Sequence, residues 1–158
     1  MRIRLICDGR IKNAQLRALQ EDYLGRLKHF TELSIAEVRA NHGTRKSSVS
    51  QGQERLTPSE RHLLDRVRDS YKVLLDGEGR HLTSEEFAAW LAERTLRGTR
   101  DMAFLLGAPE GFSAAFKTKA DLCLALSRMT LTRDWAHVLL LEQIYRAFTI
   151  LRGYPYAK

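Results

Sequence analysis

The sequence predicts a single α/β domain built on a largely parallel sheet. Two observations lead to this fold class. Short apolar segments typical of strands recur along the chain, and longer segments with helical spacing separate them. Strands that alternate with helices favour a parallel sheet, because each helix returns the chain to the same end of the sheet. The length of 158 residues fits one domain with a sizeable core, and the sequence contains no internal repeat.

The first half of the chain contains two predicted strands and a helix between them. Residues 3–7 alternate in hydrophobicity and predict a strand, and apolar residues at helical spacing predict a helix over residues 13–28. A weaker strand pattern covers residues 33–38. The polar, basic segment 41–52 is rich in Ser and Gly and is a mobile loop by composition. It is either an arm that contacts phosphates or a solvated linker.

Two later helices have clear starts. Thr57 and Glu60 have the spacing of a capping box, with Pro58 at the first helical position, and this helix is expected to reach residue 69. Thr83 and Glu86 repeat the pattern, and that helix is expected to run to residue 97 before Gly98. The remaining predicted elements are strands at 71–75, 102–106 and 121–126, a short helix after residue 113, and a long helix at 134–152.

The positive charge of the chain lies mainly in its first half. The formal net charge is +7; residues 1–72 hold 15 Lys and Arg against 9 Asp and Glu, which is +6, and the remaining residues hold 11 against 10, which is +1. A basic half on one domain suggests a polyanionic partner, with nucleic acid first. The alternative is a generically basic protein.

Several other functional classes find no support in the sequence. No apolar run approaches the roughly 18 residues that a membrane span needs. Cys7 and Cys123 are distant single cysteines, which suits a reducing cytoplasm. The five histidines have no metal-ligand spacing, so no metal is expected. There is no G-x-S-x-G motif of a hydrolase, and His137, inside the last helix, is expected to serve in packing or capping.

Three predicted strand ends carry candidate ligand-binding segments, at residues 75–79, 107–111 and 127–132. Ligands of parallel sheets bind beyond the carboxyl ends of the strands, and glycine lets a backbone approach a ligand closely. None of the three matches a known phosphate-binding motif, and Leu82 stands where a dinucleotide fingerprint would have its third glycine. Each segment is therefore either a plain turn or part of a ligand site.

The last predicted helix is apolar on more than one side. A surface helix needs only one apolar stripe, so the second side is either a deep core position or a subunit interface. Glu142 and Arg146 have the i,i+4 spacing of an ion pair within the helix.

Taken together, five stretches resemble one known family. They read LD at 75–76, LLGAPEG at 105–111, ALSRMT at 125–130, LLLEQIYRA at 139–147 and PY at 155–156. Their order and spacing resemble the SPOUT-class pseudouridine-N3 methyltransferases of large-subunit ribosomal RNA, over nearly the whole chain. The resemblance implies an α/β domain with a C-terminal trefoil knot, a rare exception to unknotted chains. It also implies a homodimer with the last helix in the contact and the active site at the interface.

The resemblance further implies that S-adenosylmethionine is bound by the three strand-end segments. Large-subunit ribosomal RNA, free or in the assembled ribosome, is the implied substrate. By motif, the implied cofactor-binding residues are Leu75, Gly107, Ala108, Ser127, Arg128, Met129, Thr130, Leu131 and Thr132.

The sequence departs from the family pattern on the acceptor side. Thr132 and Arg133 replace Pro-His, His137 replaces an Arg, and Ala157 replaces the histidine of the tail; Ala108 replaces a glycine of the cofactor loop. We therefore predict Arg133 and Tyr156 as the catalytic residues, with Arg133 stabilising an anionic uracil ring. Tyr156 would orient the base, and Lys158 would lie near RNA phosphate.

Two alternatives stay open at this point. One is a divergent methyltransferase that acts on another nucleotide, and the other is a non-catalytic, knotted protein associated with RNA or the ribosome.

Overall fold

Five parallel strands form the centre of the structure, a computed structural model that describes residues 1–38, 55–107 and 111–156. Their order across the sheet is β2-β1-β4-β3-β5, and every neighbouring pair is parallel. The prediction of a parallel sheet is confirmed. The strands are β1 (Arg2–Asp8), β2 (Glu32–Val38), β3 (Tyr71–His81), β4 (Asp101–Leu106) and β5 (Leu122–Ala125).

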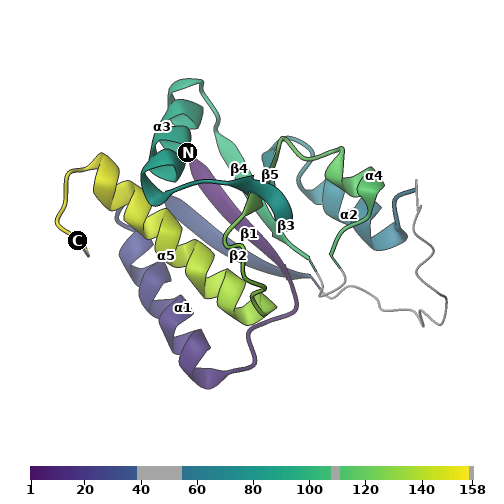
Figure 1. Cartoon of the computed structure of the whole chain (residues 1–158), viewed down its shortest axis with the longest axis horizontal. Helices are drawn as coiled ribbons and strands as arrows, with labels where there is room; N and C mark the ends of the chain where they lie inside the picture. The colour runs from purple at the N-terminus through teal and green to yellow at the C-terminus, as the bar shows by residue number, and fades with distance from the viewer. Residues whose placement is uncertain (39–54, 108–110, 157–158) are drawn as a thin grey trace.

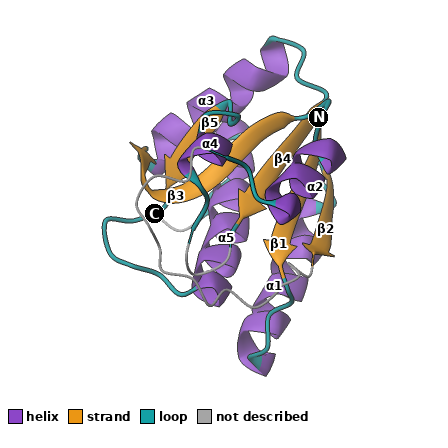
Figure 2. Ribbon diagram, turned by 90° about the vertical axis from the view of Figure 1, so that its right-hand side faces the viewer, coloured by secondary structure: helices purple, strands orange, loops and turns teal. Residues whose placement is uncertain are grey.

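Helices cover both faces of this sheet (Figure 1). One face carries α1 (Ala14–Leu27), α3 (Ser84–Leu96) and α5 (Arg133–Leu151), and the other carries α2 (Pro58–Arg66) and α4 (Ala114–Lys117). Figure 2 shows the strands between the two helical layers. The chain is thus a three-layer α/β/α domain, as the alternation of elements predicts.

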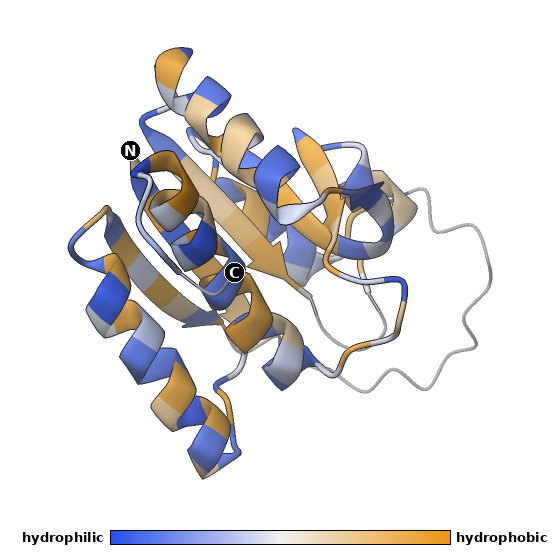
Figure 3. Ribbon diagram, turned by 60° about the vertical axis from the view of Figure 1, so that its left-hand side comes forward, coloured by the Kyte–Doolittle hydropathy of each residue, from blue (hydrophilic) through white to orange (hydrophobic). Residues whose placement is uncertain are grey.

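Alternation along the strands divides the core between the two layers. Ile3 and Leu5 of β1 pack with Leu140 and Ile144 of α5, whereas Ile6 belongs to the cluster under α2 and α4. All five are buried. Figure 3 shows hydrophobic residues along the central strands and polar residues scattered over the helices around them. A sheet buried on both faces accounts for the nearly continuous apolar sequence of β4.

The helix starts agree closely with the capping patterns. Both predicted capping boxes are present, with the Thr57 and Thr83 side chains accepting the backbone N–H of Glu60 and Glu86, respectively. The end of α2 differs from the prediction, since the helix stops at Arg66 and not at residue 69. Val67, at the C-cap, is fully buried in the core under α2 and α4.

Strand β3 is longer than predicted. We expected it to end at residue 75, but it continues to His81. Leu75 and Arg80 both pair with Leu124 of β5, so residues 76–79 bulge out of the ladder between them. Gly79 permits this path, because a Cβ there would lie 2.7 Å from the Cys123 carbonyl carbon. The segment 75–79 is therefore a bulge within a strand and not a strand end.

Some predictions fall on residues outside the described ranges. They concern the loop 41–52, Ala108, Ala157 and Lys158. The trefoil knot also stays a prediction. In the described part of the chain, none of the helices combines the length and apolar character that a membrane crossing requires.

Candidate functional site

The carboxyl ends of β1 and β4 lie at one level of the sheet, beside the point where β3 begins to bulge. Cys7 of β1 is opposite Leu106 of β4, and Leu74 of β3 is opposite Leu105. Gly107 therefore follows β4 directly beside the points where β1 ends and β3 begins to bulge. Parallel pairing thus brings together the sequence-predicted segments that contain Leu75 and Gly107.

Gly107 is enclosed by an aromatic side chain from its own loop. A Cβ at Gly107 would lie 2.7 Å from Cε2 of Phe112. The Phe112 ring stacks on Phe116 of α4, with ring centroids 4.7 Å apart, and Phe116 is buried. Any side chain at position 107 would therefore displace the Phe112 ring.

The segment after β5 presents polar and apolar groups to solvent. The Ser127 hydroxyl accepts the Met129 backbone N–H at 2.9 Å. Arg128, Met129 and Thr130 are exposed, and Met129 is 79% exposed. Leu131 is half-buried, and Thr132 caps α5. An exposed methionine beside this polar turn can contact a bound ligand.

Arg133 lies over the end of β1, on the same edge as Gly107. Its Nη2 donates to the Arg10 carbonyl at 3.3 Å and to Asp134 Oδ1 at 3.0 Å. Asp134 Oδ2 in turn accepts the Lys12 backbone N–H at 3.3 Å. The amino end of α5 therefore holds the chain that leaves β1, and the guanidinium of Arg133 is fixed at the rim of the candidate site.

His137 is buried one turn further along α5. Its Nδ1 lies 3.6 Å from Sγ of Cys7 on β1, and only 3% of the residue is exposed. Burial lowers the pKa of His137 to about 4 and raises the pKa of the Cys7 thiol to about 12. Both groups are neutral near pH 7, and a neutral His137 can pack against the sheet without a charged partner. This agrees with the packing role that its position in the last helix predicts.

Tyr156 lies at the opposite end of α5 from Arg133. Its hydroxyl is 3.2 Å from that of Tyr23 on α1, and its ring meets Tyr145 edge-on, with ring centroids 4.8 Å apart. Arg146 lies 5.0 Å from the centre of the Tyr156 ring. Tyr145 is twelve residues after Arg133, or about 18 Å along the helix. One chain therefore does not bring the two predicted catalytic residues together.

Three side chains that sequence reasoning did not select connect the candidate segments. Lys117 of α4 forms ion pairs with Asp76 at 2.6 Å and Glu78 at 3.2 Å, both in the β3 bulge. The Glu60 carboxylate on α2 accepts the Ser113 backbone N–H at 2.8 Å. Phe112 covers Gly107, as described above. The capping-box pattern identified Glu60 as a helix cap, but it gave no sign of the bond to Ser113. Contacts of Glu60 and Lys117 with distant segments leave no local pattern in the sequence, apart from a charged residue beside apolar ones.

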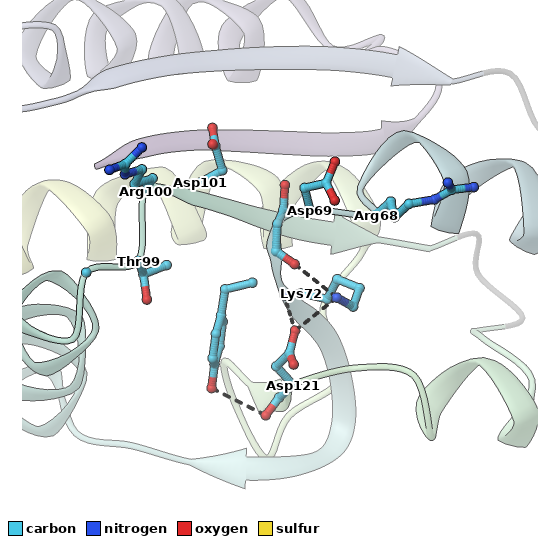
Figure 4. Close-up of a pocket in the computed structure, with 10 residues that line it drawn as sticks. Arg68, Asp69, Lys72, Thr99, Arg100, Asp101 and Asp121 are labelled. Carbon is cyan, nitrogen blue, oxygen red and sulfur yellow. Dashed lines mark hydrogen bonds and ion pairs between the residues drawn. The ribbon is translucent and has the colours of Figure 1, made fainter.

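A separate groove lies at the amino edge of the sheet (Figure 4). It has a volume of about 490 Å³. Its charged lining residues are Arg68, Lys72 and Arg100 together with Asp69, Asp101 and Asp121. Lys72 pairs with Asp121 at 3.3 Å, and positive and negative groups are equal in number. The groove is far from the three candidate segments and has no excess charge that would favour an anion.

The fold and the site together define an α/β protein with a candidate ligand site at the carboxyl edge of a parallel sheet. The family model of predicted SPOUT methyltransferases matches residues 1–157. The chain belongs to the SPOUT methyltransferase family, and the resemblance found in its motifs is confirmed.

Curated relatives share the full length of the chain. A ribosomal RNA large subunit methyltransferase H of Geobacter sp. (strain M21) is 38% identical over 99% of this chain and 98% of the relative. Proteins with the same name from Symbiobacterium thermophilum and Malacoplasma penetrans are 37% and 34% identical, each over 100% of both chains.

A solved structure shares the fold. It is that of a probable methylase family protein from Haemophilus influenzae Rd KW20, with a TM-score of 0.55 and 13% identity over 99% of this chain and 70% of the other.

The neutral state of His137 predicts a pH-dependent stability. The pKa is lowered from 6.5 to about 4 in the folded chain, so between these values the unfolded chain binds more protons and stability falls as pH falls. The wild type should lose free energy of unfolding between pH 7 and pH 4, because His137 must take up a proton on unfolding. His137→Leu lacks this group, so its loss over the same pH range should be smaller by about 3 kcal/mol. Urea titrations at both pH values measure it. The exposed His62 of α2 is the control, and His62→Ala should match the wild type; an equal decrease in His137→Leu would contradict the prediction.

Proposed function

We propose that this protein uses S-adenosylmethionine to methylate ribosomal RNA of the large subunit, at N3 of a pseudouridine, in the cytoplasm. The observation that carries the proposal is the convergence of Leu75, Gly107 and Arg133 at one edge of a SPOUT-family sheet. The names of the full-length relatives support the RNA substrate. The net charge of +6 on residues 1–72 suits contact with RNA phosphates.

The proposed cofactor site uses the three segments around the carboxyl edge. Leu75 and Gly107 would contribute backbone and apolar contacts, and Ala108 belongs to the same proposed set. The segment after β5 would contribute Ser127, Arg128, Met129, Thr130, Leu131 and Thr132. S-adenosylmethionine has both an adenine ring and a charged amino-acid part. The exposed Met129 side chain suits the ring, and the polar turn at Ser127 suits the charged part.

When bound, S-adenosylmethionine supplies a methyl group that its sulfonium makes electrophilic. The chain must place the acceptor in line with that methyl group and exclude water. The acceptor nitrogen must lose its proton to react, and in this proposal the proton passes to solvent at the rim of the site. Arg133 cannot take this proton because a guanidinium stays charged, but it can stabilise the resulting anionic ring by charge-assisted hydrogen bonds. Burial and the Tyr23 hydroxyl raise the pKa of Tyr156, so its hydroxyl keeps a proton with which to orient the base.

A homodimer through α5 would complete this site. Trp135 is 54% exposed and Ile150 is 40% exposed on α5, about four turns apart. A twofold axis across α5 would pair the helix with an antiparallel copy of itself. That arrangement would bring Tyr156 of one chain towards Arg133 of the other, which a single chain does not do.

The first test is cofactor binding. The wild-type protein should bind S-adenosylmethionine in calorimetry, and Gly107→Val should abolish binding because the new side chain displaces Phe112. Gly25→Val is the matched control, since a Cβ at Gly25 has no atom within 4 Å. Mass spectrometry of large-subunit RNA should show one methyl group fewer in cells that lack the protein. Binding without any change in RNA mass would instead support a non-catalytic, RNA-associated role.

The acceptor side has a separate test. Arg133→Ala should lower the rate of methyl transfer to ribosomal subunits by about 10²–10³, the usual cost of losing a positioned donor, while the affinity for S-adenosylmethionine stays nearly unchanged. Arg100→Ala, an exposed arginine at the other edge of the sheet, should retain the wild-type rate. If Arg133→Ala is fully active, Arg133 does not stabilise the acceptor.

The interface is tested by solution mass. Light scattering at micromolar concentration should give twice the mass of one chain, and Ile150→Glu should shift the mass towards that of one chain because it places a charge in the apolar contact. Leu96→Glu is the control, because Leu96 is 88% exposed on α3 and away from α5's outer face. A monomeric wild type would contradict the proposed interface, and the second apolar side of α5 would then be part of the core of one chain.

A further inference from the structure

Glu60 is a buried carboxylate that serves two helices at once. It closes the capping box of α2, where Oε2 accepts the Thr57 backbone N–H at 2.8 Å. It also crosses to the start of α4, where Oε1 accepts the Ser113 backbone N–H at 2.8 Å and Oε2 accepts the Ser113 hydroxyl at 3.0 Å. Only 7% of Glu60 is exposed. Three hydrogen bonds from two segments of the chain therefore converge on this carboxylate.

The second capping box of the chain lacks this crossing contact. Glu86 accepts the Thr83 backbone N–H at 2.8 Å, as Glu60 does for Thr57, but Glu86 is exposed and serves α3 alone. A capping glutamate needs no burial to do its work. The burial of Glu60 and its bonds to Ser113 are thus additional to capping.

Ser113 connects Glu60 to Gly107. The Ser113 hydroxyl caps α4 by accepting the Phe116 backbone N–H at 3.2 Å, and Phe116 stacks with Phe112, which covers Gly107. A shift of Ser113 would move Phe112 and open the space over Gly107. Burial raises the pKa of Glu60, but the Ser113 and Thr57 N–H groups and hydroxyls outweigh it, so the net pKa is lowered and the carboxylate stays ionised.

We propose that Glu60 is a positioning residue for the methyl donor, which it serves by fixing Ser113 and, through Phe112, the backbone at Gly107. The inference rests on one part of the proposed function, namely that Gly107 contacts S-adenosylmethionine. Glu60 itself touches neither donor nor RNA. Its removal would leave two backbone N–H groups without their acceptor at the edge of the cofactor segment.

Paired substitutions Glu60→Gln and Glu86→Gln test the inference. Each removes the charge from one capping box, so both should lower the melting temperature by a few degrees. Only Glu60→Gln should weaken S-adenosylmethionine binding, by about tenfold in calorimetry at a temperature where circular dichroism shows both variants folded. In methyl-transfer assays its KM for the donor should rise while kcat at saturating donor stays near the wild-type value.

Ser113→Ala provides a second, milder variant. It removes the Ser113 hydroxyl bond to Glu60 and the hydroxyl cap of α4, but leaves the α2 capping box and the Ser113 N–H bond to Glu60. It should therefore weaken S-adenosylmethionine binding a few-fold even if Glu60→Gln does not fold. Two results would overturn the inference but leave the proposed function standing. One is equal affinity for S-adenosylmethionine in the wild type and all three variants, and the other is equal weakening in Glu60→Gln and Glu86→Gln. A wild-type protein that does not bind S-adenosylmethionine would overturn the proposed function, and the inference with it.

Discussion

Parallel pairing of β4 with β1 on one side and β3 on the other is the constraint on which the candidate site depends. Its register sets Leu106 opposite Cys7 and Leu105 opposite Leu74, so β1 and β4 end at the level where β3 begins to bulge. The pairing determines where the segments emerge but not their shapes, because loop backbones have no ladder to hold them. The short helix α4 supplies that restraint from both of its ends. Ser113 at its start bonds to Glu60, and Lys117 at its end pairs with Asp76.

Two buried titratable groups near this edge are stabilised in opposite ways. Glu60 keeps its charge because N–H and O–H donors surround the carboxylate. His137 faces the thiol of Cys7, and burial together with the nearby Arg133 outweighs the attraction of Asp134, so its pKa is lowered and it is neutral. The charge that the site does present comes from Arg133, which is partly exposed and held by Asp134 and the Arg10 carbonyl. A fixed cation at a rim is suited to a transient anion, since its orientation is set before the anion forms.

Local patterns predict most of this fold because the relevant interactions are local. Thr57 and Thr83 each cap a helix through a residue three positions on, and the i,i+4 pair of Glu142 and Arg146 forms at 2.7 Å as predicted. The continuation of β3 to His81 was missed, because Gly77 and Gly79 favour a turn, and only the pairing of Arg80 and His81 with β5 carries the strand past them. The bond between Glu60 and Ser113 spans 53 residues, and no periodicity encodes such a contact. The motif resemblance predicts the cofactor segments, but it could not show that Arg133 lies at the start of α5 and Tyr156 near Tyr145, about 18 Å along the helix.

That separation and the second apolar side of α5 have one explanation in the proposed homodimer. An isologous contact repeats each surface on both chains, so an antiparallel pair of α5 helices would cover Trp135 and Ile150 and would set the amino end of one helix beside the carboxyl end of the other. Glu142 and Arg146 lie towards the middle of α5 and pair with each other within one helix at 2.7 Å. The Arg146 side chain also lies over the Tyr156 ring, so this ion pair helps to hold the tail beside α5. Dimerisation, tail placement and assembly of the acceptor side would then depend on the same few side chains of α5.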